Sequence, residues 1–200
     1  MSRNRARSTQ FRAIAATTAF GLAALACAKS DAPVDTATTV APTPAPATAP
    51  AINDAQIAHI AVTANAIDSA AGVLARQKGA AKEVKDFAQT MITDHTAVNK
   101  EAVALATKLG VTPEDNDTSR SLKSGADAST ATLQGLTGAA FDKAYIDNEV
   151  TYHQAVLDAI DKTLVPSAQN GELKALLEKV RPAIAAHLDH AKRIQGSLTK

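Results

Sequence analysis

Apolar residues recur every three or four positions along four long stretches of the chain. Four ranges share this spacing: residues 53–79, 82–109, 138–165 and 170–198. The spacing matches the period of an amphipathic helix that buries one face. None of these stretches alternates between polar and apolar residues, as a half-buried strand would. The pattern therefore predicts an all-α domain over residues 53–200.

The predicted helices also carry start and stop signals. Asn53 opens the first helix and Gln56 follows three residues later, which is the pattern of a capping box. Gly79 is a natural stop for the first helix. The third helix is expected to end before Pro166, because proline lacks the N–H that a helix interior needs.

The connections predict how the helices are arranged. Short connections at residues 79–82 and 166–170 indicate two antiparallel helix pairs. Residues 111–137 are polar and small, with one weak helix around 119–134, and they are expected to cross over from one pair to the other. The predicted fold is a four-helix bundle with a long crossover between helices two and three.

Residues 1–26 are expected to be a signal peptide. Arginines without any acid precede an apolar run of about fourteen residues, AIAATTAFGLAALA, which is too short to span a bilayer as a mature helix. Ala24 and Ala26 suit ordinary signal peptidase. Small residues before Cys27 also resemble a bacterial lipobox, although Leu25 is one place closer to the cysteine than usual. Both alternatives export the chain to the periplasm or outer membrane, and the second anchors it in the membrane through lipidated Cys27.

Residues 27–52 are rich in proline, alanine and threonine and cannot form a core. They are expected to be a semi-rigid polyproline II tether, or else a tail without a role of its own. Cys27 is the only cysteine, so an exported chain has no intramolecular disulfide and must be held together by packing.

The charge of the exported chain argues against nucleic acid as a partner. The whole chain has 21 Lys and Arg against 20 Asp and Glu, and four of the arginines lie in residues 1–26, which contain no acid. Subtracting 4 from 21 leaves 17 basic side chains against 20 acidic ones, a formal charge of −3. Such a chain does not attract phosphate backbones. The sequence identifies no protein partner.

Three of the five histidines lie on apolar stripes of three different predicted helices. His95, His153 and His187 are each near the middle of their helix. Helices of similar length that pack side by side keep their midpoints level, whether they run parallel or antiparallel. The three imidazoles are therefore expected to meet in one layer of the core.

Carboxylates lie at the same height as these histidines. Glu149 is one turn before His153 on the same helix face. Asp68 is at mid-height on the first helix, next to the stripe residue Ile67. Asp94 is on the second helix and points away from its apolar stripe.

Burying three imidazoles without partners would cost free energy, so their nitrogens are expected to have hydrogen-bond partners, a metal ion or solvent. A hydrogen-bonded layer that includes Glu149, tyrosine hydroxyls and water would provide such partners and would fix the register of the helices. A transition-metal ion such as zinc, iron, copper or nickel, held by His95, His153, His187 and Glu149, is the second hypothesis. The third is weak convergence around an open, solvated cleft.

A set of short motifs resembles one protein family. The motifs are DAQ (54–56), VKDFA (84–88), MITDH (91–95), LTGAAFDKAYI (136–146), HQ (153–154) and Pro182 before HL (187–188). Together they resemble domain-of-unknown-function family 4142, a ferritin-like family of exported bacterial proteins that are labelled as outer-membrane proteins. The resemblance covers about residues 53–197. It implies a ferritin-like bundle and supplies no function.

The chain lacks the ligand pattern of ferritin-like di-iron proteins, which place Glu-x-x-His on two helices. The residues three positions before the stripe histidines are Ile92, Val150 and Ile184. The folded part also has no nucleophile motif, glycine-rich phosphate loop or Cys–His pair. We therefore expect a cell-envelope bundle with a binding or structural role that is not an enzyme. The alternative is a metal-binding or metal-dependent redox protein.

Overall fold

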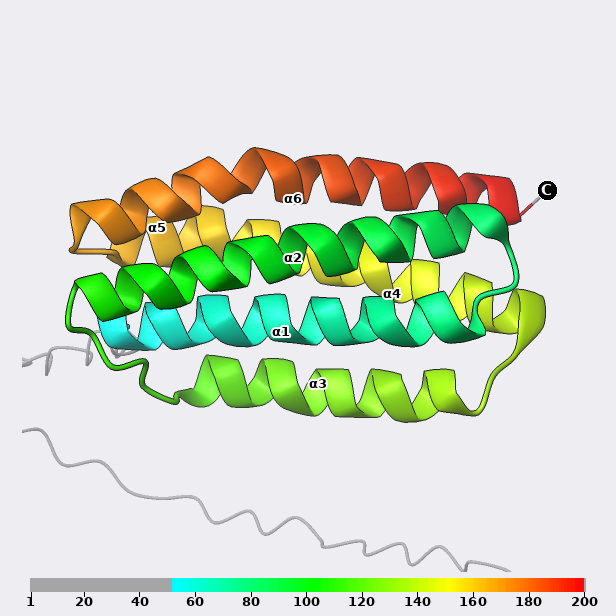
Figure 1. Cartoon of the computed structure of the whole chain (residues 1–200), viewed down its shortest axis with the longest axis horizontal. Helices are drawn as coiled ribbons and strands as arrows, with labels where there is room; N and C mark the ends of the chain where they lie inside the picture. The colour runs from blue at the N-terminus through cyan, green and yellow to red at the C-terminus, as the bar shows by residue number, and fades with distance from the viewer. Residues whose placement is uncertain (1–51, 200) are drawn as a thin grey trace, which may run out of the picture. The chain divides into compact units, whose positions relative to one another are not determined.

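The computed structural model describes residues 52–199, which form helices and no strand. The long helices are α1 (Asp54–Lys78), α2 (Lys82–Lys108), α3 (Asp117–Gln134), α4 (Gly138–Ala159) and α6 (Gly171–Leu198). A π-helical turn, η1 (Ile160–Leu164), and the short α5 (Val165–Ser167) extend α4. In Figure 1, α1, α2, α4 and α6 lie side by side, which confirms the predicted four-helix bundle.

The crossover between α2 and α4 contains a helix of its own. The weak helix predicted around residues 119–134 is α3, which begins behind a capping box at Asn116. It runs along the outside of α1 and carries the chain back to the other end of the bundle (Figure 1). As a result, α4 runs antiparallel to α1, and α6 runs antiparallel to both α2 and α4.

Side-chain caps fix the helix starts and the short connections. The predicted capping box forms, since Asn53 Oδ1 accepts from the Gln56 amide at 2.8 Å and Gln56 Oε1 accepts from the Asn53 amide at 3.2 Å. Asp142 of α4 accepts hydrogen bonds from two amides of the α1–α2 connection. Asp54 of α1 does the same for the connection before α6.

The predicted end of the third helix is wrong. The helical chain does not end before Pro166 but continues through η1 to Ser167. The π turn η1 lies just ahead of the proline and changes the register of the backbone hydrogen bonds there. For that reason the proline does not act as a stop.

The buried face of α1 also differs from the predicted stripe in its second half. The stripe ran through Ile67, whereas the buried positions are Asp68, Gly72 and Ala75. Helix α2 approaches so closely that a Cβ at Gly72 would lie 2.9 Å from the carbonyl oxygen of Ala88. This close contact turns the small and polar residues of α1 inward.

Helix α1 is long and apolar enough to cross a membrane by length and composition. Its packing against α2, α3 and α4 accounts for that apolar character in another way. Its buried Asn65 and Asp68 also face the interior of the bundle. We therefore describe α1 as a core helix.

The buried apolar residues form two clusters along the bundle. We call the first the aromatic half: Ala75, Val84, Phe87, Ala88, Met91, Leu133, Phe141, Tyr145, Ile146, Ala191 and Ile194. We call the second the aliphatic half: Ile57, Ile60, Leu157, Ile160, Leu164, Leu173, Leu177, Ile184 and Leu188. The three predicted histidines lie between the two halves.

Residues 1–51 and 200 are outside the described part of the chain. The predicted signal peptide, Cys27 and nearly all of the tether fall there. They stay predictions.

Candidate metal centre

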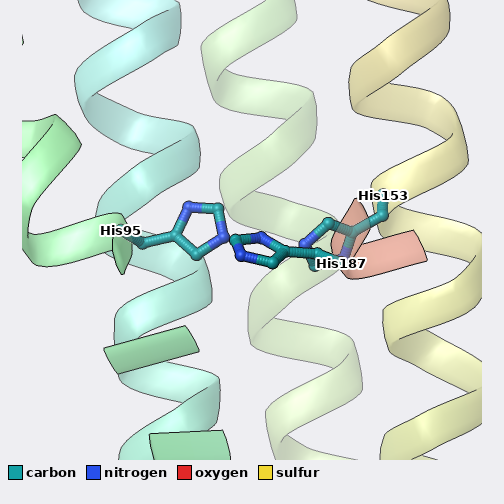
Figure 2. A group of neighbouring side chains, drawn as sticks. All are labelled: His95, His153 and His187. Atoms are coloured by element: carbon teal, nitrogen blue, oxygen red, sulfur yellow. The ribbon is translucent and has the colours of Figure 1, made fainter. Parts of the chain in front are cut away.

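His95, His153 and His187 meet in one layer of the core. They come from α2, α4 and α6, and their side chains point toward one another (Figure 2). The centroid of the His95 ring lies 5.6 Å from that of His153 and 5.2 Å from that of His187, and the last two centroids are 5.5 Å apart. The three residues are 4%, 1% and 7% exposed. The three imidazoles thus converge as expected, and they are buried.

One ring nitrogen of each histidine is hydrogen-bonded to a group that only accepts. His95 Nδ1 donates to Asn65 Oδ1 at 2.8 Å, and His153 Nδ1 donates to the backbone oxygen of Glu149 at 3.0 Å. The Asn65 amide is oriented by its own Nδ2, which donates to a backbone carbonyl of α1 at 2.8 Å. Because these oxygens have no hydrogen to give, Nδ1 carries the hydrogen in both rings.

In His187 the hydrogen-bonded nitrogen is Nε2, whereas in His95 and His153 it is Nδ1. His187 Nε2 donates to Asp94 Oδ2 at 2.9 Å, from α6 to α2. A carboxylate oxygen on the outer nitrogen fixes both the tautomer and the orientation of an imidazole. In each of the three rings, a hydrogen bond to one nitrogen therefore fixes the orientation of the imidazole.

The other ring nitrogens have no hydrogen-bond partner. His95 Nε2, His153 Nε2 and His187 Nδ1 are buried and unpaired, and so are both carboxylate oxygens of Asp68. Asp68 Oδ2 lies 3.1 Å from His95 Nε2 and 3.4 Å from His153 Nε2. In neutral rings these nitrogens bear lone pairs. Lone pairs that face a carboxylate require a proton or a cation between them.

The spacing of these donor atoms suits a metal ion. At metal–ligand distances of about 2.0–2.1 Å, two ligands of a tetrahedral zinc ion are about 3.3 Å apart. The two distances from Asp68 to the imidazoles, 3.1 and 3.4 Å, bracket that value. The three imidazole donor atoms lie within 4.8 Å of one another. Each of the four bundle helices contributes one of these four side chains.

Burial disfavours the protonated form of two of the imidazoles, His95 and His187. Removal from water, followed by the nearby His153 and His187, lowers the pKa of His95 to about 3. Burial also lowers the pKa of His187, although its bond to Asp94 opposes this. At neutral pH both rings are therefore neutral and present their lone pairs.

Burial raises the pKa values of the neighbouring carboxyl groups, whereas it lowers those of His95 and His187. Burial, reinforced by the neighbouring Glu149 carboxylate, raises the pKa of Asp68 well above its usual range. Burial raises the pKa of Glu149 to about 8. A single proton on Asp68 would satisfy at most one of the three imidazole lone pairs. Two would remain without a partner.

The model of one protein family, Domain of unknown function (DUF4142), matches residues 39–194. The chain belongs to this family. The match confirms the resemblance carried by the sequence motifs, and it contains Asp68 and all three histidines. No curated protein and no solved structure matches the chain. DUF4142 names no function, so the function must be argued from the site.

From the sequence of this DUF4142 domain, the positions of the three histidines were predicted more accurately than those of the polar groups around them. Asp68 was placed beside the apolar stripe, whereas it is 1% exposed and faces two of the imidazoles. Asp94, predicted to point away from the apolar stripe of its helix, accepts a hydrogen bond from His187 of α6. Asn65 was missed. The available signal was a polar pair, Asn65 and Asp68, three residues apart in an otherwise apolar helix.

Glu149, the predicted fourth ligand, lies beside Asp68 rather than among the three imidazoles. Glu149, Asp68 and His153 place one donor atom each within 4.8 Å of one another. The Nδ1 of His153 is already used by the backbone oxygen of Glu149. Asp68 Oδ2, at 3.1 Å from His95 Nε2 and 3.4 Å from His153 Nε2, is therefore the stronger candidate for a fourth position, and a direct role of Glu149 stays a prediction.

Proposed function

We propose that this protein binds a divalent first-row transition-metal ion and that zinc suits its site best. The ligands are His95 Nε2, His153 Nε2, His187 Nδ1 and one oxygen of Asp68. Three imidazole nitrogens and a carboxylate oxygen match the four-coordinate preference of zinc. Iron, copper and nickel also accept imidazole, and retention of iron or copper would favour a redox role.

The observation that supports this proposal is the set of inward lone pairs. In a purely hydrogen-bonded layer, each buried nitrogen would face a group of the opposite kind. Here the single N–H of each ring is used on the outside, by Asn65, the backbone of Glu149 and Asp94. A cation satisfies all three inward nitrogens and Asp68 together, and the outer partners are those expected around a metal site.

Metal content and affinity of a tag-free chain test the proposal. After exposure to zinc and dialysis, we expect about one ion per chain, since the four ligands form one site. Asp68→Asn and His153→Ala are each expected to weaken zinc binding by more than roughly 100-fold, because even changes behind the ligands cost 10–100-fold. His59→Ala is the matched control, since His59 belongs to neither group of potential metal ligands among the described residues.

Two results would contradict the proposal. The first is a wild-type chain that holds no stoichiometric zinc, iron, copper or nickel. The second is unchanged affinity in Asp68→Asn and His153→Ala, when circular dichroism shows that both are folded. The variants are then compared with His59→Ala in the same competition assay.

The affinity should depend on pH in one direction. Asp68 must be deprotonated to bind a cation, and burial raises its pKa. Metal binding therefore releases protons, and zinc affinity is expected to rise with pH as Asp68 loses its proton. A competition titration with a chelator at several pH values measures the slope. An affinity that falls with pH would exclude Asp68 as a ligand.

We further propose that the protein is exported and holds its metal in the bacterial cell envelope without being an enzyme. The support is the signal-like residues 1–26, the proline-rich residues 27–52 and the formal charge of −3 that remains after cleavage (17 basic against 20 acidic side chains). Mass spectrometry of the mature N-terminus tests it. A lipid-modified Cys27 supports an anchor, an unmodified Cys27 at the N-terminus excludes it, and an intact Met1 contradicts export.

A further inference from the structure

We propose that a cavity beside the metal site binds a small, uncharged apolar molecule and holds it against the metal ligands. The cavity has a volume of about 100 Å³ and is lined by residues of α1, α2, α3, α4, η1 and α6. Its walls include Ile60, Ile160, Leu177 and Ile184, which are buried residues of the aliphatic half. No residue of the aromatic half lines it.

The polar groups of the cavity gather at its end next to the imidazoles. The Tyr152 hydroxyl there already donates to a backbone carbonyl of α1 at 2.9 Å, and Asn65 is used by His95. Asp68, His95 and His153 also line the cavity, and these three are the residues with buried, unpaired atoms. A molecule in the cavity would touch aliphatic carbon on most sides and the metal ligands at one end.

The fold keeps this space open by two features. Small side chains stand where larger ones would fill it: Ala61, Ala64, Ala155 and Ala159. The π turn η1 widens the backbone that carries Ile160 and Leu164, and such turns are frequent at functional sites. An apolar void lowers stability through the contacts it lacks. Its position beside the unpaired atoms of Asp68, His95 and His153 points to a ligand site.

Size and polarity define the class of ligand. An apolar cavity of about 150 Å³ stays dry and takes up benzene or xenon. The present cavity, at about 100 Å³, suits molecules from a diatomic gas to a short hydrocarbon. Ions and strongly polar molecules would lose hydration without gaining partners along the aliphatic walls. The exposed residues Thr118 and Ala155 line the cavity and mark its route to solvent.

Xenon titration of the tag-free chain, followed by methyl NMR, tests the cavity itself. Methyl signals of Ile60, Leu177 and Ile184 are expected to shift saturably with xenon pressure. Ala159→Leu fills the cavity from the C-terminal end of α4 and should weaken xenon binding by roughly tenfold or more. Ala144→Leu is the matched control, because Ala144 is a half-buried alanine of the same helix that packs against the aromatic half.

Two outcomes would overturn the cavity site. One is the absence of saturable shifts in the wild-type chain. The other is equal xenon binding in Ala159→Leu and Ala144→Leu. Val156→Phe, at another wall position, serves as the second filling variant if Ala159→Leu does not fold.

The contact with the metal rests on the function proposed above and needs a separate measurement. Relaxation of dissolved ¹²⁹Xe is compared between chains loaded with paramagnetic Co²⁺ and with diamagnetic Zn²⁺. Faster relaxation with Co²⁺, lost in Ala159→Leu, supports a ligand held against the metal. Equal relaxation in chains with stoichiometric Co²⁺ overturns that contact. If no Co²⁺ or Zn²⁺ binds while xenon does, the metal site fails and the cavity stands.

Discussion

The two halves of the core are built from the same four helices but are filled differently. In the aromatic half, Phe87, Phe141 and Tyr145 are fully buried, and two of the rings stack with centroids 6.3 Å apart. The aliphatic half has no aromatic member, contains the π turn and borders a cavity of about 100 Å³. The difference indicates that tight packing stabilises one end of the bundle, whereas the other end keeps space beside the proposed metal ligands.

The largest expected effect is loss of an aromatic ring. Phe141→Ala should lower the free energy of unfolding by about 3–5 kcal/mol, since the removed ring leaves a cavity in a filled region. Ile184→Ala, which enlarges an existing cavity, should fall near the lower end of the 2–5 kcal/mol range for aliphatic truncations. Urea denaturation of the metal-free proteins measures both. A larger loss of unfolding free energy for Ile184→Ala than for Phe141→Ala would contradict the tighter packing of the aromatic half.

Zinc should strengthen both halves at once. Each of the four bundle helices supplies one proposed ligand, so the ion links the halves through their shared layer. At free zinc about 100 times the dissociation constant, linkage adds about 2.7 kcal/mol to the free energy of unfolding. Hydrogen exchange should slow in both halves, and Asp68→Asn should abolish the gain. Slower exchange in one half only would show that the layer does not couple them.

The layer also predicts a pH dependence of the metal-free protein. The pKa of Glu149 is raised from 4.5 to about 8, so its stabilising contribution is complete below pH 4.5 and is lost as pH rises to about 8. The pKa of His95 is lowered from 6.5 to about 3, so its contribution is complete above pH 6.5 and is lost toward acid. These contributions oppose each other between pH 4.5 and 6.5.

Above pH 6.5 the carboxyl contribution remains alone, and Asp68 acts in the same direction. Stability should fall by at most about 2 kcal/mol per carboxyl group between about pH 6.5 and about pH 8. Glu149→Gln, which cannot ionise, should flatten this decline. Thermal unfolding in chelator-treated buffer measures it. A flat wild-type profile would mean that Glu149 is ionised throughout.

Periodicity and capping signals were sufficient to predict the bundle. The capping box at Asn53 and the layer of three histidines follow from spacing along single helices, which the sequence displays directly. Asp68 could not be assigned to the interior, because its burial depends on the contact between α1 and α2 at Gly72. The histidine tautomers and the cavity also could not be predicted from the sequence. They depend on which atoms of different helices meet, as in the bond from His187 to Asp94.

The smallest expected effect separates a cavity from ordinary loose packing. Ala159 is half-buried on the cavity wall, and a leucine there should be neutral or stabilising by up to about 1 kcal/mol, because it buries apolar surface in existing space. Ala88 in the aromatic half is fully buried next to Gly72, so Ala88→Leu should cost about 1–3 kcal/mol. Equal costs for the two alanine-to-leucine changes in urea denaturation would mean that the aliphatic half is as tightly packed as the aromatic half, and the contrast between them would fail.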